Sequence, residues 1–151
     1  MLTRYCIKLY GVDKTKQLLL AYKNNLFDKQ GLAYLVGSQS LEFFCMYFLQ
    51  DVYTGDDKAP LAKIHYELWE EIQNAILNTN GTKYEYILPR GTGKTTCITL
   101  PIAIWSSLYN YKIYTVISSS IGATAEQFIA NIKIALQDNI YIKKAFGELI
   151  N

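Results

Sequence analysis

Hydrophobic side chains recur every three or four positions along much of the chain, a spacing typical of amphipathic helices. In residues 123–139, for example, Phe128, Ile132 and Leu136 share one face. Asp13, Ser40 and Pro60 each stand where such a stretch begins, as expected at a helix N-terminus. The pattern predicts helices over residues 13–27, 40–53, 60–78, 94–109, 123–139 and 140–149. Pro101 is expected to kink the fourth of these helices or to end its first segment.

Two shorter stretches, residues 84–88 and 112–118, are rich in β-branched and aromatic side chains, which predicts strands. From residue 84 onward the order is strand, glycine-rich loop, helix, strand, helix. This order favours parallel strands joined by right-handed crossovers. We therefore expect an α/β fold, a partial parallel sheet flanked by helices and preceded by an α-helical N-terminal segment. Two strands are too few for such a sheet, so the chain is expected to stop in the middle of a domain.

The best internal boundary is the polar stretch of residues 54–60, "TGDDKAP", which has the composition of a turn or short linker. It divides the chain into a helical lead-in, residues 1–58, and the front portion of an α/β domain, residues 59–151.

Composition indicates a globular protein, because half of the 151 residues are hydrophobic and 19% are charged. The net charge of +2 is too small to imply nucleic-acid or membrane binding by itself. The three cysteines are scattered, which favours reduced, buried thiols over a zinc site or disulfides. No apolar run is long enough to span a membrane, so a soluble intracellular protein is expected.

Candidate chemistry is concentrated in "YILPRGTGKTT", residues 86–96. Gly91 and Gly93 allow the backbone to turn several N–H groups toward one anion, and the next helix offers its N-terminus. Lys94 can reach the β- and γ-phosphates, and the Thr95 hydroxyl is placed to bind Mg²⁺. The pattern predicts a nucleotide site, while the simpler interpretation is a glycine turn between a strand and a helix.

Leu88 and Arg90 depart from the general phosphate-loop pattern. Leu88 stands where the first glycine is usual. Arg90 is either a solvated loop cation or an arginine that reaches the γ-phosphate in cis.

Two further positions have a structural and a functional interpretation. His65, about thirty residues before Lys94, is either an ordinary residue at the edge of a helix stripe or, as in many motor ATPases, a polar group that contacts adenine. Ser118, Ser119 and Ser120 end the second predicted strand, where they either form a turn that caps the next helix or, as in translocating ATPases, contact nucleic-acid phosphates.

These residues resemble the N-terminal ATPase part of a viral large terminase, the DNA-packaging motor of bacteriophages. In that family the loop often has the form Pro-Arg-Gly-x-Gly-Lys-[ST], which matches "PRGTGKT" here. The helix with a tryptophan after the loop and the aromatic lead-in "SLEFFCMYFL" are also similar, and the resemblance covers roughly residues 40–151.

The resemblance implies a RecA-type P-loop ATPase that couples ATP hydrolysis to DNA translocation into a procapsid. It implies Lys94 and Arg90 as catalytic residues, Thr95 as the Mg²⁺ ligand, and the cytoplasm of an infected bacterium as the location. Implied partners are double-stranded DNA, a terminase small subunit, the portal or procapsid, and further copies of the same chain. The residues expected to bind ATP are Pro89, Arg90, Gly91, Thr92, Gly93, Lys94, Thr95, Thr96 and His65.

Hydrolysis also needs an acidic pair at a strand end, and none of the carboxylates after Lys94 (Glu126, Asp138 and Glu148) follows an apolar strand. The chain is therefore expected to bind ATP weakly without turning it over alone. Two alternatives stay open: a non-hydrolytic module that binds a nucleotide or a partner, and another helicase-like motor ATPase.

Overall fold

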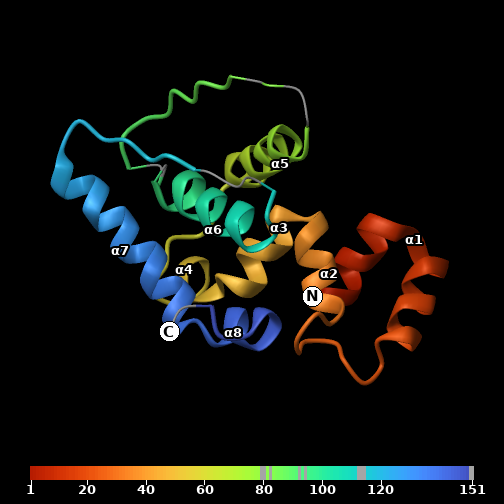
Figure 1. Ribbon diagram of the computed structural model, residues 1–151. Helices are drawn as coiled ribbons and strands as arrows, with labels where there is room; N and C mark the ends of the chain where they lie inside the picture. The colour runs from red at the N-terminus through yellow and green to blue at the C-terminus, as the bar shows by residue number, and fades with distance from the viewer. Residues whose placement is uncertain (79–80, 82, 92, 94, 112–114, 150–151) are drawn as a thin grey trace.

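A computed structural model describes residues 1–78, 81, 83–91, 93, 95–111 and 115–149. Over these residues the protein is all-helical (Figure 1). Its elements are α1 (Leu2–Ala21), α2 (Leu32–Gln39), α3 (Leu41–Phe43), η1 (Phe44–Phe48), α4 (Gln50–Tyr53), α5 (Lys63–Leu77), η2 (Thr95–Thr99), α6 (Leu100–Leu108), α7 (Gly122–Asp138) and α8 (Ile140–Phe146). The segments η1 and η2 are π-helical.

The predicted α/β fold with a parallel sheet is wrong, since none of the described residues forms a strand. Residues 84–88 and 115–118 are irregular and lie largely at the surface, with Ile87 86% and Val116 71% exposed. The first three residues of the second predicted strand, 112–114, lie outside the described residues. Side-chain composition gives only a local preference, whereas a strand also needs neighbours to complete its hydrogen-bond ladder and cover its faces. These segments have no such neighbours in the described structure.

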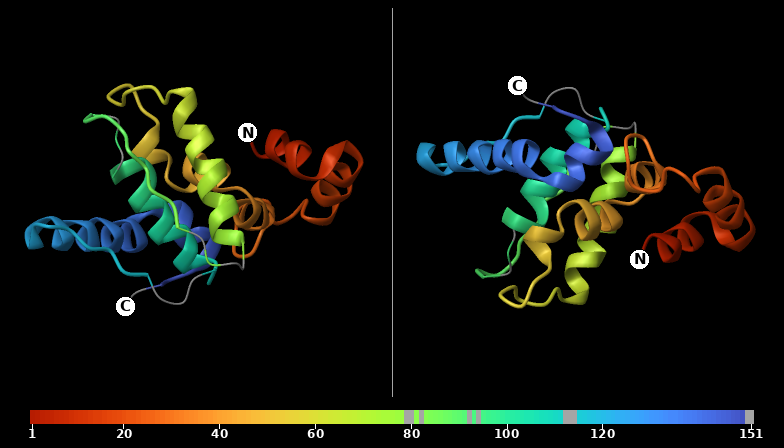
Figure 2. Two further views of the ribbon diagram at one scale, coloured as in Figure 1. Left: turned by 90° about the horizontal axis from the view of Figure 1, so that it is seen from above. Right: turned by 90° about the horizontal axis from the view of Figure 1, so that it is seen from below.

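The helices are arranged around one aromatic core, with α1 at one end of the molecule and α7 at the other (Figures 1 and 2). Helix α1 packs on α2, while α7 packs on α6 and α8. The core includes Phe43, Phe44, Phe48, Trp69 and Trp105, all fully buried. It thus joins residues from both sides of the polar stretch at residues 54–60.

Trp105 anchors α6 to α2, because its indole Nε1 donates a hydrogen bond of 2.8 Å to the Gly37 carbonyl. Neighbouring side chains lie so close to the Gly37 backbone that position 37 requires glycine. A Cβ added there would lie 2.5 Å from the Tyr109 hydroxyl and 2.8 Å from a Phe48 ring carbon.

Several helix predictions are confirmed, although their boundaries differ. Ser40 caps the helix that follows it, accepting a hydrogen bond from the Phe43 N–H at 3.1 Å. Helix α7 covers almost the expected range, and α8 follows it directly. The expected single helix over residues 40–53 is instead divided into α3, η1 and α4, with Leu49 outside helical geometry (φ −110°, ψ 29°).

Two helix starts were predicted wrongly. Pro60 is not a first helical residue, because Ala62 is still extended (ψ 160°) and α5 begins at Lys63. The first helix begins at Leu2 rather than at Asp13 and ends at Ala21. Gly11 interrupts it with φ 79° and ψ 173°, a conformation that is available to glycine at little cost.

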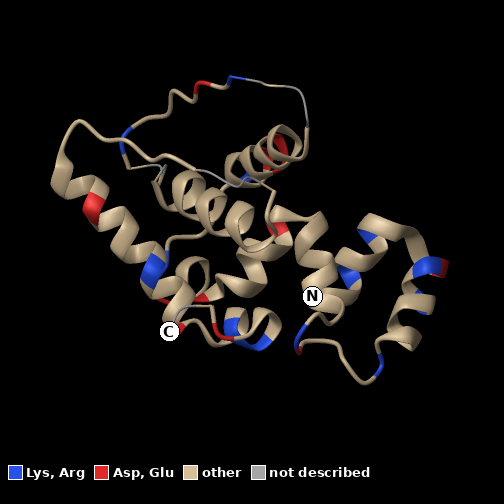
Figure 3. Cartoon of the chain, viewed as in Figure 1, with Lys and Arg blue, Asp and Glu red and all other residues tan. Residues whose placement is uncertain are grey.

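No helix within the described ranges is both long and apolar enough to cross a membrane. In the view of Figure 3, basic and acidic residues are scattered over several helices instead of gathering in one patch.

Asn139 joins α8 to the core and gives a test of this packing. Its side-chain oxygen accepts hydrogen bonds from the N–H groups of Tyr141 (3.0 Å) and Ile142 (2.9 Å). Its side-chain amide donates to the Phe48 carbonyl at 2.7 Å. Asn139→Ala removes a helix cap and leaves a buried carbonyl unpaired, so the free energy of unfolding in urea should fall by about 2–3 kcal/mol. The exposed Asn131 of α7 is the control, since Asn131→Ala should change it by less than about 0.5 kcal/mol.

Buried tyrosines predict a loss of stability at alkaline pH. Burial raises the pKa of Tyr53 and Tyr109 well above the ordinary value of about 10. The unfolded chain therefore releases these phenolic protons at lower pH than the folded chain. The resulting stabilisation is complete below about pH 10 and is lost as pH rises above it. The urea midpoint should accordingly fall between about pH 9 and about pH 11, and Tyr109→Phe should reduce that fall. A midpoint that stays constant over this range would contradict the prediction.

Candidate functional site

The glycine loop has a backbone that only glycine adopts readily. Gly91 and Gly93 have φ values of 83° and 67°, in the left-handed region. Directly after them the chain becomes helical, and the Cys97 N–H donates to the Gly93 carbonyl at 2.7 Å. The expected helix after the loop is therefore confirmed, as η2 followed by α6. A helix N-terminus thus follows the two left-handed glycines, which is the arrangement that anion-binding loops use.

Pro101 explains the shape of that helix. Proline has no N–H, so it cannot donate to the carbonyl four residues earlier in an α-helix or five residues earlier in a π-helix. Those two carbonyls belong to Cys97 and Thr96. Each accepts a side-chain hydrogen bond instead: the Trp69 Nε1 donates to Cys97 O at 2.7 Å, and the Tyr53 hydroxyl donates to Thr96 O at 2.6 Å. The predicted disturbance at Pro101 is thus a π-helical turn before it, held by side chains from α4 and α5.

A cavity of about 320 Å³ lies beside the glycine loop. Gly91, Gly93 and Thr96 line it from the loop and the helix start. Other parts of the lining come from the end of α4, the polar stretch and the start of α5. The lining residues are Val52, Tyr53, Lys58, Ala59, Pro60, Leu61, His65, Gly91, Gly93, Thr96 and Cys97. Its volume falls in the range of small-molecule sites, which combine apolar walls with a few polar groups.

The structure brings His65 to the same cavity as the glycines, although 26 residues separate it from Gly91 in sequence. His65 is half-buried on the first turn of α5, and its Nδ1 accepts a hydrogen bond from the Ala62 N–H at 2.9 Å. A neutral His65 ring must therefore carry its proton on Nε2, which makes that nitrogen a donor. Contact with adenine stays a prediction.

Only one of the other predicted site residues that the structure describes, apart from the glycines, lines this cavity. Thr96 lines the cavity, whereas Arg90, Pro89 and Thr95 are exposed outside its lining. Thr95 is the first residue of η2. Thr92 and Lys94 lie outside the described residues.

The three serines at the end of the second predicted strand are exposed. The Ser119 hydroxyl accepts a hydrogen bond of 3.3 Å from the Ile121 N–H, just before α7 begins. This contact is consistent with a local turn at the helix start, and contact with nucleic-acid phosphates stays a prediction.

Sequence reasoning did not identify Tyr53, Trp69 and Lys58 as residues at or behind the candidate site. For the first two a signal was present, because Pro101 shortly after the loop implies two carbonyls in need of donors. Lys58 gave no comparable signal, since the polar stretch that contains it has the composition of an ordinary turn.

A larger cavity, about 500 Å³, lies between α1, α3, η1 and α5. It is lined in part by Tyr5, Glu42 and Tyr66. There the Tyr5 hydroxyl donates to Glu42 at 2.6 Å, and Lys8 pairs with the same carboxylate at 3.0 Å. None of its lining residues comes from the glycine loop. The smaller cavity is therefore the better candidate for a nucleotide site.

The residues at the smaller cavity fit the phosphate chain of a nucleotide. Two left-handed glycines adjoin a helix start, and the polar side chains of the lining (Tyr53, Lys58, His65 and Thr96) are neutral or cationic. Mg²⁺ usually keeps several waters and takes one or two protein carboxylates beside the phosphates, and its binding by the Thr95 hydroxyl stays a prediction. Among the described residues there is no cluster of three or more His, Cys, Asp or Glu side chains suited to a metal ion.

Comparison of the chain with models of known protein families, with curated proteins and with solved structures finds no match.

Proposed function

We propose that this chain binds the phosphates of Mg²⁺-ATP on residues 91–96 and supplies the ATP-binding part of a terminase-type DNA-packaging motor. The observation that carries the proposal is the pair of left-handed glycines, Gly91 and Gly93, directly before a helix start and in one cavity with His65. Backbone N–H groups at such a turn and the positive end of the helix dipole both favour a bound anion. These two effects do not depend on a sheet.

The phosphates and the base of ATP would bind to different parts of the cavity. Its phosphates would lie on the glycine loop, near Thr96. Its base would pack on the apolar part of the lining, which includes Val52 and Leu61. The His65 Nε2–H is a suitable donor to a ring nitrogen of adenine. Bound Mg²⁺ would neutralise charge on the β- and γ-phosphates, with Thr95 as its protein ligand.

The motor context rests on the sequence resemblance, chiefly on "PRGTGKT". It would place the protein in the cytoplasm of an infected bacterium, in contact with double-stranded DNA, a small terminase subunit, the portal and further copies of itself. Arg90 is exposed directly before Gly91, and in this proposal it would reach the γ-phosphate of a bound nucleotide. Because none of the carboxylates after Lys94 follows an apolar strand, the purified chain is expected to bind ATP without releasing phosphate, and Lys94-dependent release of phosphate would contradict that expectation.

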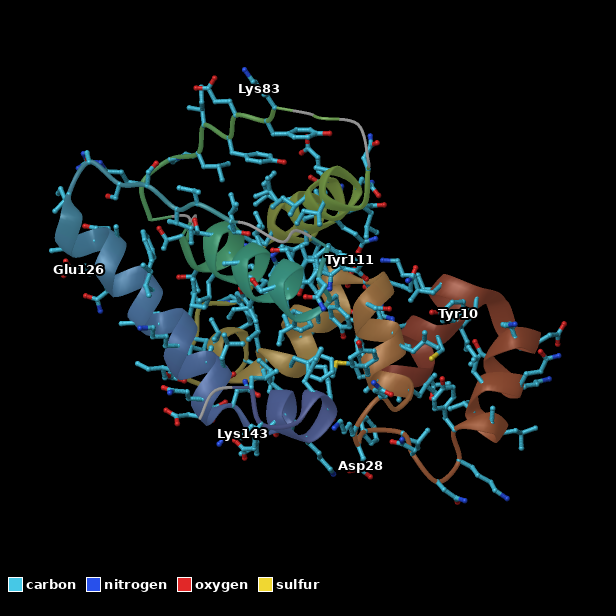
Figure 4. All side chains as sticks on the ribbon, viewed as in Figure 1. Tyr10, Asp28, Lys83, Tyr111, Glu126 and Lys143 are labelled. Carbon is cyan, nitrogen blue, oxygen red and sulfur yellow. The ribbon has the colours of Figure 1, made fainter. Side chains whose placement is uncertain are left out.

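Lys94→Ala is the direct test of phosphate binding. The variant would lack the contact of the lysine with the β- and γ-phosphates. The Kd for Mg²⁺-ATP should therefore rise at least about tenfold in isothermal titration calorimetry. Lys83→Ala is the matched control: Lys83 is exposed, and Figure 4 shows its side chain pointing away from the body of the molecule. Absence of ATP binding by the unmodified chain, or equal affinities for the two variants, would contradict the proposal.

Tyr53→Phe tests whether the helix behind the loop must be held in place. The change removes the hydrogen bond to Thr96 O, so the Kd for ATP should rise by about three- to tenfold. Tyr109→Phe is a matched control, because the Tyr109 hydroxyl also donates to a backbone carbonyl, that of Tyr34 at 2.9 Å, away from the cavity. Both variants should lose about 1 kcal/mol of unfolding free energy, but only Tyr53→Phe should weaken ATP binding. Equal ATP affinities would show that Tyr53 serves stability alone.

A further inference from the structure

Lys58 lines the candidate nucleotide cavity from the polar stretch of residues 54–60, a part of the chain without helix or strand. Its Nζ is 3.0 Å from the Asp57 carboxylate, and both side chains remain accessible to solvent, at 39% for Lys58 and 78% for Asp57. The backbone beneath it forms a turn, in which the Lys58 N–H donates to the Gly55 carbonyl at 3.1 Å. Gly55 has φ 144°, a value that L side chains rarely adopt, so this turn depends on glycine.

We infer that Lys58 is a second phosphate-binding cation, which exchanges its Asp57 partner for a phosphate of the bound nucleotide. This inference rests on the proposed function, because it concerns the same cavity. It adds a cation that the glycine-loop motif does not contain, from a residue 33 positions before Gly91.

The exchange is favourable because the present partner is weakly held. An ion pair between exposed side chains contributes little to stability, since water screens both charges and the pairing restricts long side chains. The Asp57 carboxylate is charged at neutral pH and competes for the ammonium, and the hydrogen bond from Lys58 lowers the pKa of Asp57. A triphosphate carries more negative charge than one carboxylate and would lie in a cavity that is partly shielded from water.

The exchange has a specific consequence for ligand preference. Lys58 adds attraction only for the phosphate part of the ligand, so it should raise the affinity for ATP and ADP but not for adenosine. The ATP affinity should also depend more steeply on salt concentration when Lys58 is present, because one more exposed charge takes part in binding.

The experiment measures the Kd of Mg²⁺-ATP, ADP and adenosine for the whole chain and for single variants. Lys58→Ala should weaken ATP binding about five- to tenfold and leave adenosine binding unchanged. Lys58→Arg should restore most of the affinity. Lys63→Ala is the matched control, because Lys63 is also an exposed lysine paired with a neighbouring carboxylate, Glu67 at 2.9 Å, but does not line the cavity.

Asp57→Asn tests the exchange itself. Freeing Lys58 should tighten ATP binding about two- to threefold, and the gain should disappear in the Asp57→Asn, Lys58→Ala double variant. Equal ATP affinity of Lys58→Ala and Lys63→Ala would overturn the inference while leaving phosphate binding by the glycine loop intact. If the unmodified chain binds none of the phosphorylated ligands, the proposed function fails and this inference with it.

Discussion

The site depends on a proline that follows the glycine loop. Pro101 provides no N–H to the turn before it, so the carbonyls of Thr96 and Cys97 need donors from elsewhere. Tyr53 and Trp69 supply these donors at 2.6 and 2.7 Å. The helix that begins at the loop is thereby attached to α4 and α5, and the glycines, His65 and Lys58 come to line one cavity.

Two tryptophans, one of which takes part in this attachment, explain why the N-terminal helices and the later helices form one core. Trp69 is fully buried under η2, and Trp105 is fully buried against Gly37, so each indole ties together segments far apart in sequence. Both indole N–H groups are satisfied by backbone carbonyls, which makes burial of these large side chains favourable. The residues that precede the polar stretch are therefore part of the support of the candidate site.

The sequence was informative where local physics decides the structure. The helical spacing of residues 123–139, the Ser40 cap and the start of a helix after Gly93 all appear in the structure, because each depends on residues within a few positions. The sheet was predicted wrongly, because β-branched and aromatic side chains at residues 84–88 and 115–118 do not provide neighbouring strands. His65 could be proposed for the site from its spacing, while Lys58 depends on how the polar stretch folds against the loop.

The attachment of η2 has a mechanical consequence. One side of the glycine loop joins a helix that two side-chain hydrogen bonds hold in place, and the other side joins exposed residues such as Arg90 and Ile87. The start of the helix after Gly93 is thus held by side chains of α4 and α5, so a ligand at the proposed site would meet a backbone that is already supported before it binds.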